Sequence, residues 1–307
     1  MLCGLKGNNK IHMNLKVLLD IPRLLKQSMN LLQKNDPLRM AGATAFFTTF
    51  ALPAILVILI QALGLVFKRE NISNELMQKL SSILGKQTVE QVTGTLSGFS
   101  NLADNWFITI GGFVFLIFVA TTLFVVIKSS LNQIWGIRLL AHPKISFRLR
   151  IRLRSLLVIL FAGFLFVLGL LVDSIQLFLG NSLRDYLPGL MPYLIVLSNI
   201  FISVIIVSGW FIILFRFLPD GHPTWKVALI GGLFTSIFFN IGKWVLRVLL
   251  INGNLQSLYG TSASVVLLLL FVFYAALIFY YGAAFTKVFS MHINEPIRSS
   301  SHAEKED

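Results

Sequence analysis

Residues 106–127 read WFITIGGFVFLIFVATTLFVVI and contain no charged side chain. A helix that crosses the ~30 Å hydrocarbon core of a bilayer needs about 20 mostly apolar residues, because each residue adds ~1.5 Å along its axis. This stretch is long enough and apolar enough to do so. It therefore predicts a transmembrane helix.

The composition of the whole chain points to the same class of protein. Hydrophobic residues make up 56% and charged residues 13% of the 307 residues, and the mean hydropathy is +0.79. Soluble domains carry roughly 45–50% apolar and about 25% charged residues. We therefore expect an all-α membrane protein with little chain left for a soluble domain.

Six apolar runs are long enough to cross a bilayer, with or without some tilt. They are Ala41–Phe67, Trp106–Ile127, Leu156–Leu179, Pro192–Phe215, Val227–Ile251 and Ser264–Thr286. We predict that they form six transmembrane helices.

Lys and Arg residues are distributed unevenly around these runs. Nineteen lie before the first run, after the second, after the fourth and after the sixth, whereas five lie in the segments on the opposite side. Because Lys and Arg are enriched in cytoplasmic loops, we expect both termini in the cytoplasm. The same enrichment explains the net charge of +13 without a nucleic-acid partner.

The predicted spans divide the chain into three parts. Residues 1–37 form a cytoplasmic segment, in which Leu15–Leu32 is expected to be an amphipathic helix on the inner membrane surface. Residues 38–290 form the six-helix transmembrane domain, with an amphipathic helical insert on the outer face at about 70–100. Residues 291–307 are expected to be a disordered cytoplasmic tail.

A basic segment follows the second predicted span, with Arg148, Arg150, Arg152 and Arg154 at every second position. Strict alternation is typical of a strand, but an isolated strand at a membrane surface would leave backbone groups unpaired. An irregular or helical segment on anionic headgroups is the better interpretation, so membrane lipids are the expected partners.

Three ionisable residues lie inside predicted spans, where charge is costly and commonly functional. They are Asp173, Lys243 and Arg247. The rise of ~1.5 Å per residue places Asp173 at a depth between the two bases. We predict a cluster of these residues with Asn240 that binds an anionic lipid or a small anion. The alternative is that both bases extend to the outer headgroups and Asp173 is a structural partner.

Small residues and one proline mark predicted sites of close helix packing. Gly231, Gly232 and Gly282 let neighbouring helices approach closely. Pro53 removes a backbone hydrogen bond from the first span and predicts a kink, which is either static or a hinge.

Catalytic patterns are missing from the sequence. The five histidines are scattered, and neither a metal-binding motif nor a nucleophile motif occurs. Asp220 and His222 lie between Pro219 and Pro223, a composition typical of a turn. We predict no catalytic residue, no metal and no cofactor, and therefore no enzyme.

Several motifs, in order along the chain, resemble the YihY/BrkB family of bacterial inner-membrane proteins. They are Ala41-Gly-Ala-Thr-Ala-Phe-Phe with Phe50-Ala-Leu-Pro53, Leu131-Asn-Gln-Ile-Trp-Gly136, Phe215-Arg-Phe-Leu-Pro219, Tyr259-Gly-Thr-Ser and Gly282-Ala-Ala. The resemblance implies six spans in the bacterial inner membrane and links to envelope lipid export and serum resistance. This chain has Ala284 where many members have an acid.

Three functions follow as hypotheses. The first is a transporter or flippase for an anionic or amphiphilic envelope substrate, and the second is a membrane scaffold for envelope assembly. The third is the ribonuclease activity that the family's older name, ribonuclease BN, suggests. Phosphodiester cleavage needs a metal site or an acid–base pair, and the cytoplasmic loops offer no clustered acids, so the sequence disfavours it. The sequence does not predict an oligomeric state.

Overall fold

The computed structural model describes residues 20–63, 106–139, 191–252, 263–299 and 303–305, and single positions between residues 74 and 169. Five helices in this part of the chain are long and apolar enough to cross a membrane. They are α3 (Pro37–Leu63), α6 (Trp106–Trp135), α8 (Met191–Phe217), α9 (Trp225–Asn252) and α11 (Ala263–His292). Each coincides with a predicted run, so the chain is a mostly helical, multi-pass membrane protein.

Other predicted segments fall where the structure gives few or no positions. The run Leu156–Leu179 and the insert at about 70–100 lie largely outside the described residues. The same holds for residues 1–19, which include the start of the predicted surface helix. Six spans therefore stay a prediction.

Helix α6 is longer than its predicted span and does not end at Ile127. Leu131 and Ile134 are fully buried and Trp135 nearly so, which means that the apolar face continues for two more turns. The predicted end of this span at Ile127 is therefore wrong, because the next residue, Lys128, lies within the helix and is itself buried.

Helix α2 (Ile21–Gln33) is amphipathic and packs against α11. Its buried residues Leu24, Ser28 and Leu32 are spaced four apart and share one face. The chain then turns through Asp36, whose φ of 52° lies in the left-handed region, and enters α3 at Pro37. Proline suits a first helical turn, where its missing N–H has no helical acceptor.

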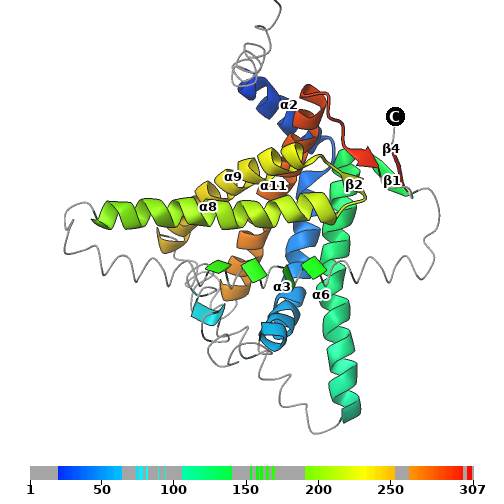
Figure 1. Ribbon diagram of the computed structural model, residues 1–307. Coiled ribbons are helices and arrows are strands. Elements are labelled where there is room, and N and C mark those ends of the chain that lie inside the picture. Colours follow the sequence, from blue (N-terminus) through cyan, green and yellow to red (C-terminus); the bar gives the residue numbers. More distant parts are fainter. Residues whose placement is uncertain are drawn as a thin grey trace, which may run out of the picture.

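Helix α11 lies in the middle of the helices and contacts α2, α3, α6 and α9, while α8 packs along α9 (Figure 1). Tyr280, Ala283 and Ala284 of α11 are fully buried. In Figure 1 the α8–α9 pair crosses α3 and α6 at a large angle, so its far end lies away from them.

Aromatic side chains join α8 to α11 and α6 near the end where these helices meet. Phe279 of α11 stacks on Phe211 and Phe215 of α8, with ring centroids 5.8 and 5.2 Å apart. Trp135 of α6 lies 6.4 Å from Phe215. Such ring pairs are worth about 0.5–1.5 kcal/mol beyond their buried area.

Two short antiparallel strand pairs close this end. β1 (Ile137–Leu139) pairs with β4 (Ala303–Lys305), and β2 (Gly221–His222) pairs with β3 (Arg298–Ser299). The prediction of a disordered tail is wrong for these residues of 291–307. Each strand of the tail satisfies its backbone groups against a loop that comes from elsewhere in the sequence.

Helix α2, the start of α3, the ends of α6 and α11, the strands and the α8–α9 turn, all predicted to be cytoplasmic, lie at one end of the molecule (Figure 1). Gln133, near the end of α6, donates to the carbonyl of Asn35 and accepts from Arg39. Exposed basic side chains gather at this end; they are Arg23, Lys26, Lys34, Arg39, Arg138, Lys226 and Arg298.

Candidate functional site

The predicted anion-binding residues lie on α9, as far as they are described. Asn240 accepts a hydrogen bond from Ser203 of α8 at 2.9 Å and donates one to the Ser236 carbonyl at 2.9 Å. Ser236 in turn donates to the Val204 carbonyl at 2.8 Å. These bonds tie α9 to α8, so the Asn240 amide is engaged in helix packing.

The charged members of that predicted cluster are not brought together by described contacts. Lys243 is half-buried one turn beyond Phe239 on α9. Arg247 belongs to α9, but its side chain and all of Asp173 lie outside the described residues. Their grouping stays a prediction. The headgroup-binding prediction for Arg148, Arg150, Arg152 and Arg154 also falls on residues outside the description.

The predicted packing glycines lie where helices approach closely. A Cβ on Gly231 of α9 would be 2.1 Å from Thr286 Oγ1 of α11, and a Cβ on Gly282 of α11 would be 1.9 Å from Thr235 Oγ1 of α9. The two helices are antiparallel, so each contributes the glycine of one pair and the threonine of the other. Each threonine fills the space that the facing glycine leaves open.

Two other predicted positions also lie at packed sites. A Cβ on Gly232 would be 2.5 Å from the Ile212 side chain of α8, so this glycine serves the α8–α9 contact. Pro53 lies inside α3, between the fully buried Ala51 and Ala54. Because proline has no backbone N–H, the carbonyl of Thr49 receives no helical hydrogen bond from it. The helix nevertheless continues on both sides of Pro53.

A buried ion pair joins α6 to the turn between α8 and α9. Lys128 Nζ lies 2.8 Å from Asp220 Oδ1, and the two side chains are only 7% and 6% exposed. Lys128 lies inside a segment apolar enough to span a membrane. Charged side chains in such segments are rare and turn toward the protein interior, which makes this pair the candidate functional site.

Asn132 completes the site from the same face of α6, four residues after Lys128. Its side-chain amide donates to Asp220 Oδ2 at 2.8 Å, and its Oδ1 accepts the backbone N–H of Asp220 at 3.0 Å. Each carboxylate oxygen of Asp220 therefore has a donor. The amide and the lysine together hold the turn in one position.

The local sequence explains how Asp220 reaches this site. Helix α8 ends at Phe217, and Pro219 cannot continue it. Gly221 then passes so close to α6 and to the C-terminal segment that a Cβ would be 2.3 Å from Ile137, 2.9 Å from Trp135 and 2.9 Å from Ile297. Only glycine allows the turn to lie this near.

Arg216 closes the other side of the turn. Its guanidinium donates to the carbonyl of Pro223 and lies 5.3 Å from the ring centroid of Trp225, a cation–π distance. The Nδ1 atom of His222 lies 3.3 Å from the carbonyl of Arg216. Arg216 and His222 thus serve the shape of the turn.

Helix α11 is tied to the same end of α6 by two bonds. The indole N–H of Trp135 donates to the Ala283 carbonyl at 3.0 Å, and Lys287 Nζ donates to the Ile134 carbonyl at 3.1 Å. Deeper in the bundle, the buried Tyr280 hydroxyl lies 2.6 Å from Thr44 Oγ1 of α3. Polar contacts therefore join α11 to both α6 and α3.

Reasoning from the sequence missed this site because its members looked ordinary. In the sequence, Lys128 directly follows an apolar run, as a loop cation would, and Asp220 lies between two prolines, as a turn residue would. The usable signal was Asn132 four residues after Lys128, which repeats a polar position on one face of an apolar helix. Both Asn132 and Asp220 lie within or next to motifs that carry the family resemblance, at Leu131–Gly136 and Phe215–Pro219.

Comparison with known proteins gives a family match over most of the chain. A family model described as "Virulence factor BrkB" matches residues 29–307. No solved structure matches the chain significantly.

Among curated proteins, the chain is similar to bacterial proteins named "UPF0761 membrane protein". It is 26% identical to one from Teredinibacter turnerae over 83% of this chain and 57% of the relative. It is 24% identical to one from Saccharophagus degradans, over 81% and 55%, and 28% identical to one from Pseudomonas aeruginosa, over 79% and 57%. The chain thus spans somewhat more than half the length of these relatives.

Proposed function

Because the chain belongs to the BrkB family of membrane proteins, we propose that it moves an anionic or amphiphilic envelope substrate across the bacterial inner membrane. Five described helices would each cross the bilayer, and Leu156–Leu179 would supply the sixth span. The gathering of exposed Lys and Arg at one end supports an orientation with both termini in the cytoplasm.

The observation that carries this proposal is the buried Lys128–Asp220 pair. Each ion loses several kcal/mol of solvation when it is buried, and apolar residues of similar volume would often be as stable or more so. A purely structural bundle gains little from such a pair. A protein with two conformations does gain, because the pair holds one arrangement and its separation permits another.

The arrangement of the helices indicates which parts would move. The α8–α9 turn is held to α6 by Lys128 and Asn132, while the far end of the α8–α9 pair diverges from α3 and α6 (Figure 1). We assign the pair the role of a latch at the cytoplasmic end. Substrate would enter beside Asp173, Lys243 and Arg247 at the outer end of the spans or leave there.

Reconstitution into liposomes tests this function. Purified full-length protein should accelerate the movement of a fluorescent anionic phospholipid between leaflets, relative to protein-free liposomes and to a zwitterionic analogue. A folded protein that moves neither lipid nor a small anion such as phosphate would contradict transport. That result would favour the alternative of a membrane scaffold, whose cytoplasmic end holds a partner protein.

A further inference from the structure

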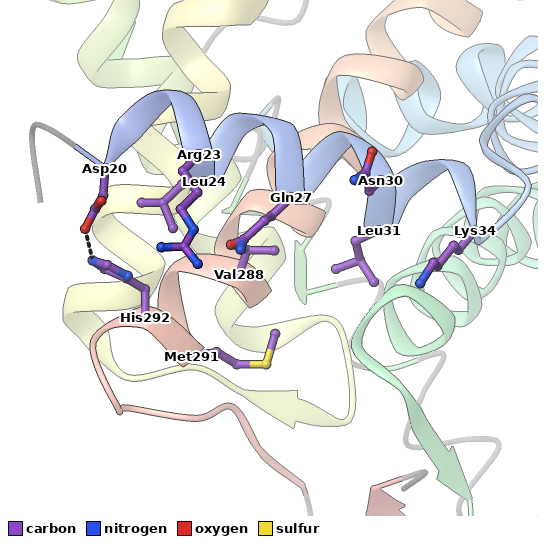
Figure 2. Close-up of a pocket in the computed structure, with 10 residues that line it drawn as sticks. All are labelled: Asp20, Arg23, Leu24, Gln27, Asn30, Leu31, Lys34, Val288, Met291 and His292. Carbon is purple, nitrogen blue, oxygen red and sulfur yellow. Dashed lines mark ion pairs between the residues drawn. The ribbon is translucent and has the colours of Figure 1, made fainter.

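A groove runs between α2 and the last turn of α11. Its volume is about 480 Å³, within the range of small-ligand sites. Figure 2 shows the side chains of Arg23, Gln27 and Lys34 of α2 directed toward the side on which Met291 of α11 lies. The lining residues are Asp20, Arg23, Leu24, Gln27, Asn30, Leu31, Lys34, Val288, Met291 and His292.

Hydrogen-bond donors line one side of this groove in a continuous row. Arg23, Gln27, Asn30 and Lys34 are spaced four, three and four residues apart, so each lies beside the next on the surface of α2. Within the described part of the chain, none of these four side chains makes a hydrogen bond or an ion pair. The row therefore has donors available for an acceptor from outside the protein.

The charge of the groove favours an anion. Arg23 and Lys34 bring two positive charges, and Asp20 is the one acid among the lining residues. The Asp20 carboxylate lies 3.7 Å from His292 Nε2, at the end of the groove near Arg23. Figure 2 shows this contact at the edge of the groove, with the guanidinium of Arg23 further along it.

Apolar side chains line the rest of the groove, which makes the site amphiphilic. Leu24 and Leu31 come from α2, and Val288 and Met291 come from α11. Soluble anions such as phosphate gain nothing from such a surface, whereas the glycerol backbone and first acyl carbons of a lipid do.

The depth of the groove also suits a lipid headgroup. The apolar segment Val265–His292 of α11 has 28 residues, which at ~1.5 Å per residue exceeds the ~30 Å hydrocarbon core by more than two turns. The last turn of α11 therefore emerges into the headgroup layer. Basic, amphipathic helices at that depth bind anionic lipids.

We propose that this groove binds one anionic glycerophospholipid of the cytoplasmic leaflet, with its phosphate between Arg23 and Gln27 and its glycerol and first acyl carbons over the accessible side chains of Leu31 and Met291. Lys34, which lines the groove at its other end, attracts the anionic headgroup at longer range. The bound lipid ties α2 to α11. This site is separate from the transport path, and it does not depend on transport.

The test uses purified full-length protein in micelles, titrated with phosphatidylglycerol. Native mass spectrometry would count bound lipid, and a photoreactive phosphatidylglycerol would map the contact after digestion. Arg23→Gln removes a charge-assisted hydrogen bond to the phosphate and should weaken binding roughly tenfold or more. Lys34→Gln should weaken it less, because it acts at longer range.

Lys26→Gln is the matched control, since Lys26 is an exposed cation on the same helix that does not line the groove. It should leave the affinity within about twofold, as expected of a surface charge. Equal losses in Lys26→Gln and Arg23→Gln would overturn the proposal in favour of general surface attraction. Crosslinks away from residues 20–34 and 288–292, or equal saturation by inorganic phosphate, would overturn it too.

Discussion

At the scale of single residues, the buried Lys128–Asp220 pair carries the expected stability effects and the proposed function. Each partner is buried, and each neutralises the other. Asn132 binds the second carboxylate oxygen and the Asp220 N–H, so the turn loses two further bonds if the carboxylate moves. Removing one partner of such a pair costs about 3–5 kcal/mol, because a charge is left buried and uncompensated.

Asp220→Asn should therefore lower the free energy of unfolding by roughly 3–5 kcal/mol. The double variant Lys128→Met/Asp220→Asn should lose less than the single one, because it leaves no unpaired charge. Unfolding of the purified protein in mixed micelles measures both. Asp36→Asn is the matched control, since the Asp36–Arg39 pair is 3.8 Å apart but 74% and 63% exposed, respectively. Additive effects of the two buried substitutions would contradict this interpretation.

Glu295 gives a pH dependence at the same scale. Hydrogen bonds from Thr224 and Lys226 hold the pKa of this carboxylate below its ordinary value of 4.5. A lowered folded pKa means that the stabilisation is complete above about pH 4.5 and is lost as the pH falls through the folded pKa.

The amides of residues 293–299 should thus be well protected from hydrogen exchange at pH 6. Below pH 4.5 their exchange should become faster relative to the intrinsic rate at the same pH, so that protection falls. Glu295→Gln should abolish this pH-dependent loss of protection, because glutamine does not titrate. Lys226→Gln should make it smaller. The same loss of protection in Glu295→Gln would show that another group is responsible.

At the scale of elements, α9 and α11 are held together by two facing glycine–threonine pairs. Gly231 lies opposite Thr286 and Gly282 opposite Thr235. Thr235 and Thr286 each donate to the carbonyl of the glycine four residues before them, at 2.7 Å, so their hydroxyls are satisfied within their own helices. The helices can therefore approach as closely as small-residue packing allows.

Gly282→Ala should destabilise the protein by about 1–3 kcal/mol, because its Cβ would overlap the Thr235 side chain. Adding Thr235→Ala should recover part of the loss. Gly42→Ala is the control, since nothing lies within 4 Å of a Cβ at that position. Thermal unfolding of the three variants provides the measurement, and equal stability of Gly282→Ala and the wild type would contradict the close packing.

The helices could be predicted from the sequence because spanning a bilayer depends on local composition. Apolar runs of about 20 residues specify a span without knowledge of any partner. The end of α6 could not be placed, because the burial of Lys128 depends on Asp220, which is far away in the sequence. The strands of the tail could not be predicted for the same reason: β1 pairs with β4, which lies more than half of the chain away in the sequence.

At the scale of the whole molecule, the end of the bundle that carries α2, the strands and the α8–α9 turn is the end assigned to the cytoplasm. Ile297 is buried next to Gly221 and β3 pairs with β2, so the C-terminal segment packs on the turn that carries Asp220. Opening of the latch would therefore also disturb the tail.

Cysteine labelling tests this orientation. In a Cys3→Ser background, cysteines at Lys226 and Arg298 should react with a membrane-impermeant maleimide only after cells are opened, because both positions are exposed at the end predicted to be cytoplasmic. A cysteine at Gly189, in a segment predicted to lie outside, should react in intact cells. Labelling of Lys226→Cys in intact cells would reverse the assignment.

If the Lys128–Asp220 pair controls movement of substrate, as proposed, lipid translocation by matched variants in liposomes is the measurement that shows it most directly. At equal amounts of folded protein, Asp220→Asn and Lys128→Met should change the rate of anionic-lipid movement at least tenfold, while Asp36→Asn should match the wild type. Equal rates in all four proteins would contradict the claim and leave the pair with a structural role alone.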